Sequence, residues 1–244
     1  MRPVFRFACL IALLAGCATE SVDSTDGFRP IFDGESFEGW RGLGQDEVPA
    51  AHWMVEDGMI RKVASGSIPR AADGQVLDGG DLMTVETFSN FELRFEWKVA
   101  PGANSGVKYN VSEALSTSNG PPSGALGFEY QVLDDGLHAD AEIASHRTGS
   151  LYDLIAAPDT KPLRPVGEFN ESRLIWSGGH GEHWLNGEMV VSFDLGTPRF
   201  DSLFAASKYA DLAEMNTTRA GHIVLQDHGD DVWFRNLRIK TLTP

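Results

Sequence analysis

The stretch Phe91-Glu92-Leu93-Arg94-Phe95-Glu96-Trp97-Lys98-Val99 decides the fold class of this chain. Its apolar and charged residues alternate over the whole stretch without a miss. Because a β-strand sends successive side chains to opposite faces, this pattern predicts an antiparallel strand with one face in a core and the other in solvent.

Turn signals on either side of this stretch indicate more strands of the same kind. Asp57-Gly58 and Asn186-Gly187 each separate two apolar runs, and both dipeptides favour the positive φ angles of tight hairpins. The apolar pattern slips by one position at Arg235-Asn236, which predicts a β-bulge. Only residues 200–215 favour a short helix. We therefore expect an all-β fold, a β-sandwich with one concave ligand-binding face.

The N-terminus reads as an export signal. Arg2 and Arg6 precede an apolar run too short to span a bilayer, which closes at Cys17. This resembles a bacterial lipoprotein signal, with an ordinary secretory signal as the alternative. We predict a signal peptide over 1–16, lipid on Cys17, a flexible tether over 17–27 and one β-sandwich domain over 28–244. Ala18 favours an outer-membrane anchor facing the periplasm or the cell surface.

Composition narrows the classes of partner and cofactor. Of the two cysteines, Cys9 lies in the signal and Cys17 would carry lipid, so the mature domain has neither a disulfide nor a thiol nucleophile. The formal net charge of −15 argues against nucleic acid as a partner. We expect contact with a bilayer through Cys17 only, and no organic cofactor.

Polar side chains on two predicted strands mark the candidate site. In Glu129-Tyr130-Gln131-Val132-Leu133-Asp134, the side chains of Glu129 and Gln131 share one face. Partial desolvation of Glu129 would raise its pKa and suit it to proton transfer, whereas a Glu paired to Lys108 or Arg235 is the structural alternative. The second segment is Gln226-Asp227-His228-Gly229, which also reads as a simple hairpin loop.

Ordered motifs along the chain resemble the 3-keto-disaccharide hydrolase family, which has a concanavalin-like, lectin-like jelly-roll fold. The motifs cover residues 29–242 and are Ile31-Phe32-Asp33-Gly34, Gly102-Ala103-Asn104-Ser105-Gly106, Glu129 to Asp134, Gly149-Ser150-Leu151-Tyr152-Asp153, Gly167-Glu168-Phe169-Asn170, Glu182-His183-Trp184-Leu185-Asn186-Gly187, Gly221 to Gly229 and Phe234-Arg235-Asn236-Leu237.

The resemblance implies cleavage of 3-keto-glycosides, including 3-keto-disaccharides. A ketone at C3 acidifies the proton on C2, so elimination of the C1 substituent followed by addition of water gives a net hydrolysis. Such a reaction needs a general base, a group that polarises the C3 oxygen and a proton donor. We expect Glu129, His228 and His183 to be these catalytic residues. Their substrate would come from a sugar 3-oxidase acting upstream.

Other polar and aromatic residues of these motifs are candidates for binding the sugar. Glutamine amides offer both a donor and an acceptor to hydroxyl groups. Asn104 lies in an apparent tight turn, while His146, together with His138, flanks Asp140 and Glu142 in a loop. The residues that we expect to bind substrate are Gln131, Gln226, Asn104, Lys108, Tyr109, Trp184, His146 and Arg235.

A divalent metal ion is compatible with this set, although no spacing is diagnostic. Its expected ligands are Asp134 and Asp227, near Glu129 and His228. Two other functions fit the same residues. One is a non-catalytic carbohydrate-binding lipoprotein; the other is a conventional glycoside hydrolase that uses Glu129 and an Asp as two carboxylates.

Overall fold

A computed structural model describes residues 26–243 except positions 51, 65, 67–79 and 119–123. The predicted signal peptide and the predicted lipidation site, Cys17, lie outside the described residues, as does the predicted tether apart from residues 26 and 27. Within the described part of the chain, no helix is long and apolar enough to cross a membrane.

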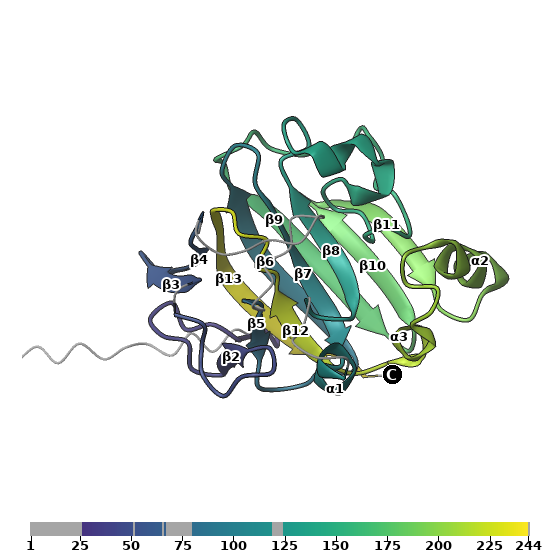
Figure 1. Ribbon diagram of the computed structural model, residues 1–244, viewed down its shortest axis with the longest axis horizontal. Helices are drawn as coiled ribbons and strands as arrows, with labels where there is room; N and C mark the ends of the chain where they lie inside the picture. Colours follow the sequence, from purple (N-terminus) through teal and green to yellow (C-terminus); the bar gives the residue numbers. More distant parts are fainter. Residues whose placement is uncertain (1–25, 51, 65, 67–79, 119–123, 244) are drawn as a thin grey trace, which may run out of the picture.

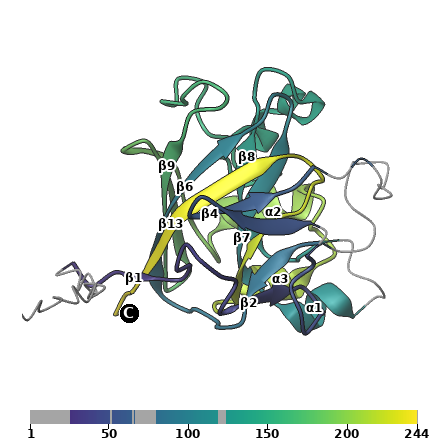
Figure 2. The ribbon, with the colours of Figure 1, turned by 90° about the vertical axis from the view of Figure 1, so that its left-hand side faces the viewer.

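Two antiparallel sheets lie one over the other (Figures 1 and 2). Sheet A has the order β11-β10-β9-β6-β13-β4-β3, with β1 paired to β13. Its strands are β1 (Arg29–Pro30), β3 (Trp53–Glu56), β4 (Met59–Lys62), β6 (Phe91–Val99), β9 (Asn170–Ser177), β10 (His180–Leu185), β11 (Glu188–Asp194) and β13 (Val232–Thr241). Sheet B has the order β2-β5-β12-β7-β8. Its strands are β2 (Trp40–Gly42), β5 (Leu82–Thr84), β7 (Asn104–Val111), β8 (Phe128–Leu133) and β12 (His222–Leu225). The predicted all-β sandwich is confirmed.

The local features predicted from the sequence are present at the expected residues. Strand β6 covers Phe91–Val99 and alternates buried and half-buried residues along its length. Asp57-Gly58 joins β3 to β4 and Asn186-Gly187 joins β10 to β11, all four residues with positive φ. The pairing of β13 with β6 shifts register between Arg235 and Arg238. The hairpins and the bulge are therefore confirmed.

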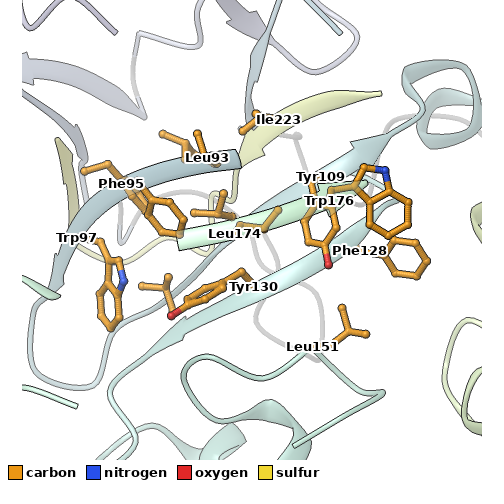
Figure 3. Close-up of a cluster of buried hydrophobic side chains, with 14 of the residues drawn as sticks. Leu93, Phe95, Trp97, Tyr109, Phe128, Tyr130, Leu151, Leu174, Trp176 and Ile223 are labelled. Atoms are coloured by element: carbon orange, nitrogen blue, oxygen red, sulfur yellow. The ribbon is translucent and has the colours of Figure 1, made fainter. Parts of the chain in front are cut away.

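Large aromatic and aliphatic side chains fill the space between the sheets (Figure 3). Sheet A contributes Phe95 and Trp176, and sheet B contributes Tyr109, Phe128 and Tyr130, each at most 2 % exposed. The ring of Phe95 meets that of Tyr130 edge-on at 5.4 Å. Each such side chain contributes about 1.5–3 kcal/mol by leaving water, so this core fixes the position of every strand beneath the site.

The helices are short and lie at the margins of the sheets (Figure 1). They are α1 (Glu113–Thr117), α2 (Pro198–Ala206) and α3 (Ala213–Thr217), with 3₁₀ turns at Ala139–Glu142 and Ala144–His146. The helix expected within residues 200–215 is thus two helices with a break between them. Helix α1 was not predicted; the side chain of Ser112 caps it by accepting a hydrogen bond from the Leu115 amide.

The outer face of sheet B, which points away from the core, carries polar side chains. All residues of β7 and β8 are buried, including Lys108, Glu129 and Gln131. Because burial of an unpaired polar group is costly, each of these side chains needs a partner in the protein, in ordered water or in a ligand.

Candidate functional site

The register between β7 and β8 places the polar residues side by side. Lys108 lies opposite Glu129, and Gly106 lies opposite Gln131. The intervening residues Val107 and Tyr130 point into the core. We call this outer surface of sheet B, formed around Gly106 by β7, β8 and the residue after β12, the polar face.

Glu129 is the most unusual group on the polar face. Its side chain is 3 % exposed, and Lys108 Nζ approaches its Oε2 at 3.8 Å while donating a hydrogen bond to the carbonyl of Ala125. Burial raises the pKa of Glu129, although the positive charges of Lys108 and Lys208 oppose this effect. A carboxylate with raised pKa is a stronger base, which suits proton transfer near neutral pH.

Three buried oxygens on the polar face have no hydrogen-bond partner among the described residues. They are Oε1 of Glu129, Oε1 of Gln131 and Oε1 of Gln226. All three residues adjoin Gly106. The carboxylate of Glu129 lies over this glycine, Gln131 lies opposite it in the β7–β8 register, and the backbone N–H of Gln226 donates to the Gly106 carbonyl at 2.9 Å. A Cβ at position 106 would lie 2.1 Å from Glu129 Oε1. Three acceptors around one small residue complement a ligand that carries several hydroxyl groups.

A chain of hydrogen bonds connects Gln131 to His228. Gln131 Nε2 donates to Asn104 Oδ1 at 3.0 Å, and Asn104 Nδ2 lies 3.4 Å from His228 Nε2. In this arrangement the amide of Asn104 donates to the ring, so the imidazole nitrogen facing it is an acceptor. The chain fixes which atoms Gln131 presents to a ligand.

His138 and Asp230 complete a cluster around His228. The two imidazole rings meet edge-on with centroids 5.7 Å apart. Asp230 Oδ2 lies 3.9 Å from His228 Nδ1 and accepts a hydrogen bond from the backbone N–H of Asn104 at 3.1 Å. Burial, followed by the neighbouring His228, lowers the pKa of His138 and keeps its ring neutral near pH 7.

The two expected metal ligands, Asp227 and Asp134, are used elsewhere. Asp227 pairs with His52 and, at 2.9 Å, with Lys62 Nζ, and its side chain is fully buried. Asp134 accepts backbone hydrogen bonds from Gly102 at 2.7 Å and Gly136 at 2.9 Å. The prediction of this ligand pair is wrong in its residues, because both carboxylates are committed to holding loops and a buried lysine.

His183 and Tyr109 lie in the core rather than on the polar face. Tyr109 donates its hydroxyl hydrogen to His183 Nε2 at 3.0 Å, and His183 Nδ1 donates to the Gly149 carbonyl at 3.0 Å. Both side chains are 0 % exposed. The expectation that His183 is catalytic and that Tyr109 binds substrate is corrected, because alternation along β7 and β10 turns both side chains toward the opposite sheet.

Trp184 and Arg235 lie on the outer face of sheet A, in the layer opposite Glu129. Trp184 stacks against the guanidinium of Arg173 at 3.9 Å and lines a hollow of about 290 Å³. Arg235 pairs with Glu96 at 2.8 Å and covers Phe169. Neither residue joins the polar face, so the prediction that they bind substrate together with Glu129 and Gln131 is corrected. Among the described residues that line this hollow, no buried side-chain acceptor lacks a hydrogen-bond partner, so we place the site on sheet B instead.

His146 is buried beside the site but its ring nitrogens are occupied. Nδ1 donates to Asp140 at 2.8 Å and Nε2 to Asp153 at 2.9 Å, and the ring stacks on Tyr152 at 4.2 Å. Burial opposes protonation of this ring, but the two carboxylates outweigh it and raise the pKa of His146. His146 therefore supports the ring of Tyr152, and the prediction that His146 binds the sugar directly is corrected.

Some residues of the site could not be recognised from the sequence. The tight turn predicted at Asn104 is wrong, because Asn104 to Gly106 begin strand β7, and nothing in the sequence marks Gly106 as part of the site. Lys208, from the segment after α2, lies over the ring of Tyr152 at 4.2 Å, and its positive charge works against the rise in the pKa of Glu129. Asp230 could have been predicted as part of the site, because it is an acidic residue two positions after His228.

Comparisons with known proteins identify the family of this chain. Residues 27–240 match the family described as the 3-keto-alpha-glucoside-1,2-lyase-like domain. A curated 3-keto-disaccharide hydrolase of Bacteroides thetaiotaomicron is 40% identical, over 89% of this chain and 79% of that protein. The crystal structure of a candidate glycosyl hydrolase from Parabacteroides distasonis matches with a TM-score of 0.75 and 29% identity, over 89% of this chain and 95% of that one. A second such structure from the same organism, at 24% identity and a TM-score of 0.63 over 88% and 99% of the two chains, shares the fold. The chain therefore belongs to the family of 3-keto-α-glucoside-1,2-lyase-like domains.

Proposed function

We propose that this protein is a glycoside-cleaving enzyme that acts on sugars carrying a ketone at C3. Its family and the name of its Bacteroides relative support this class of substrate. The single observation that carries the proposal is the buried carboxylate of Glu129, which has a raised pKa and one oxygen without a partner among the described residues.

The proposed reaction is an elimination followed by a hydration. A base removes the proton on C2, and the electron pair forms an enolate with the C3 carbonyl. When that carbonyl re-forms, a double bond appears between C1 and C2, and the C1–oxygen bond breaks as the leaving oxygen takes a proton. Water then adds at C1 and a proton returns to C2, which completes a net hydrolysis.

Glu129 is the group that moves the proton at C2. Its carboxylate is desolvated, so it binds a proton more strongly than an exposed Glu, and Lys108 at 3.8 Å limits that effect. The Lys108 ammonium is also the nearest cationic donor on the same face, placed to polarise a ketone oxygen. His228 is the second catalytic group, held at the other end of the Gln131–Asn104 chain.

The unpaired oxygens of Gln131 and Gln226 bind the sugar hydroxyls. Both accept hydrogen bonds, and hydroxyl groups donate them, so a bound sugar satisfies groups that are otherwise buried without partners. A ketone at C3 has no hydrogen to donate and must face the cationic side of the site. The protein can therefore distinguish an oxidised sugar from its parent, because a hydroxyl group donates to the glutamine oxygens, whereas a ketone only accepts from a cationic donor.

The substrate implies a second enzyme and an exported location. A 3-keto-glycoside arises when an oxidase removes hydrogen from a C3 hydroxyl, so such a reaction must precede this one. We further propose that the chain works outside the cytoplasm, attached through lipid on Cys17.

Cleavage of a 3-keto-disaccharide and of its unoxidised parent tests the proposal. The full chain and its Glu129→Gln variant are incubated with each sugar, and released monosaccharide is followed by mass spectrometry. We expect wild type to cleave the keto sugar only, and Glu129→Gln to lose at least about a hundredfold in rate. Glu96→Gln, on the outer face of sheet A, is the matched control and keeps the activity.

Two outcomes would overturn this function in favour of another. Cleavage of the parent sugar that depends on Glu129 would identify a conventional two-carboxylate glycoside hydrolase. Binding of either sugar with no product would identify a carbohydrate-binding module.

A further inference from the structure

We propose that His138, His228 and Asp230 bind a divalent transition-metal cation at the margin of the polar face. One ligand atom from each residue lies within 4.8 Å of the other two. His228 is buried, and the other two are half-buried. The cluster adjoins Asn104, which links it to Gln131.

The separation of His228 and Asp230 suits two ligands of one ion. Nδ1 of His228 and Oδ2 of Asp230 are 3.9 Å apart, too far for a hydrogen bond. Metal–nitrogen and metal–oxygen bonds are each about 2.0–2.2 Å, so a cation between the two atoms reaches both without movement of the backbone.

The chemistry of the ligands indicates which class of metal binds. Two imidazoles and one carboxylate favour zinc, cobalt or iron, whereas calcium and magnesium prefer oxygen ligands throughout. Three protein ligands leave at least one coordination position for a substrate oxygen.

Binding through His228 Nδ1 places the ring proton on Nε2, which faces Asn104. The Asn104 amide would then have to accept rather than donate, so it must turn over, and the Gln131 amide must turn with it. Both amides exchange oxygen and nitrogen without moving the chain. In the metal-bound protein Gln131 would then present its Nε2 donor to the sugar, and Gln226 Oε1 alone would keep the acceptor role that the proposed function gives to both glutamines.

Binding through His138 has a local consequence of its own. His138 Nδ1 accepts a hydrogen bond from the Asp140 amide at 3.1 Å, which leaves Nε2 for the metal. A neutral ring bound at Nε2 carries its proton on Nδ1, so that hydrogen bond must open. The Asp140 amide is therefore a reporter of occupancy, visible as a shift of its NMR resonance.

Any catalytic role of this cation rests on the proposed function, but its binding does not. At the open position it would act as a Lewis acid toward the C3 oxygen. His228 would then act through the metal, and Glu129 would remain the group that moves the proton.

Titration with Co²⁺ alone tests the site. The full chain, stripped with chelator and dialysed, is titrated by calorimetry while visible absorption reports the ligand field. We expect one Co²⁺ per chain for wild type, and affinities at least about tenfold weaker for His138→Gln and Asp230→Asn. Melting temperatures without metal show that both variants fold. His180→Gln is the control, because that ring already pairs with Asp194 and Glu182 on sheet A.

Failure of wild type to bind Co²⁺, or binding by both variants at the wild-type affinity, would overturn the metal site. Cleavage of a 3-keto-disaccharide by protein that binds no Co²⁺ would remove the metal and keep the proposed function. Stoichiometric binding without cleavage would keep the site and remove the function.

Discussion

Glu129 brings its own pH dependence to stability because its pKa is raised in the folded protein. Below its unfolded pKa of about 4.3 the carboxyl is neutral in both states and has no effect. As pH rises through the folded pKa, ionisation becomes more unfavourable in the folded state than in the unfolded one, so the folded state loses stability. The residue that suits proton transfer is therefore a destabilising one at neutral pH.

Glu129→Gln should for this reason be more stable than wild type at pH 7, with the difference vanishing below about pH 4. Thermal unfolding of both proteins across this range measures it. Glu96→Gln, which removes a carboxylate that pairs with Arg235 and is partly exposed, should stay within about 0.5 kcal/mol of wild type. A Glu129→Gln protein less stable than wild type at neutral pH would contradict this, because the attraction of Lys108 for the carboxylate would then outweigh the cost of burying it.

Gly106 is a glycine because Glu129 lies across it. In Gly106→Ala the new Cβ would lie 2.1 Å from Glu129 Oε1, so the flexible carboxylate must move while the strand stays in place. We expect a loss of about a hundredfold in kcat/KM, the scale of a misplacement near 1 Å. The melting temperature should change little. Gly136→Ala, whose Cβ meets only Asp134 Oδ1 at 3.3 Å, is the control, and equal activities in the two variants would contradict this role.

At the scale of elements, the sequence was most informative where a pattern is local. Strand β6 and the hairpins at Asp57 and Asn186 follow from alternation and from dipeptides that favour positive φ. The polar side of β8 was also predictable, since Glu129 and Gln131 alternate with core residues.

What could not be predicted is which sheet a strand joins and which face is outside. His183, on β10, has the same alternating context as Glu129, yet the topology places it in the core. Trp184, on the same strand, points away from the core into solvent on sheet A, opposite the site. The position of such a side chain depends on contacts between segments that are distant in the sequence. Asp227, for example, pairs with Lys62 and His52, which lie about 165–175 residues earlier in the chain, and no local spacing predicts these pairs.

The buried ion pair between Asp227 and Lys62 fixes the position of the segment after β12. Asp227→Asn removes the charge that Lys62 needs, and Lys62 is 0 % exposed. Breaking such a pair costs about 3–5 kcal/mol, because the remaining ammonium is left in the interior. Urea denaturation should show this loss. Asp194→Asn, an exposed partner of His180, should cost less than about 1 kcal/mol, and similar values for the two variants would contradict the role of Asp227.

For the whole molecule, the predicted lipid anchor decides where the domain works. If Cys17 is lipidated, wild type expressed in a bacterium should sediment with membranes and carry acyl chains by mass spectrometry. Cys17→Ser should lose both properties, while Cys9→Ser, which changes only the predicted signal, keeps them. A wild-type protein that is released without lipid would leave the secretory alternative.

The two sheets are joined at His183, and this makes the stability of the whole sandwich depend on pH. Burial lowers the pKa of His183 to about 4, although hydrogen bonds to Gly149 and Ser150 oppose the shift. An unfolded His titrates near 6.5, so between about pH 6.5 and 4 the unfolded chain binds the proton that the folded one refuses. The contribution of His183 to the free energy of unfolding is therefore complete above about pH 6.5 and falls by about 3 kcal/mol toward pH 4.

The variant His183→Gln should lack this part of the loss, so its free energy of unfolding, measured in urea from pH 4 to 7, should vary less than that of wild type. His180→Gln gives the opposite sign, since pairing with Asp194 raises the pKa of His180. A constant difference between wild type and His183→Gln across this range would mean that the buried ring accepts a proton without unfolding the sandwich.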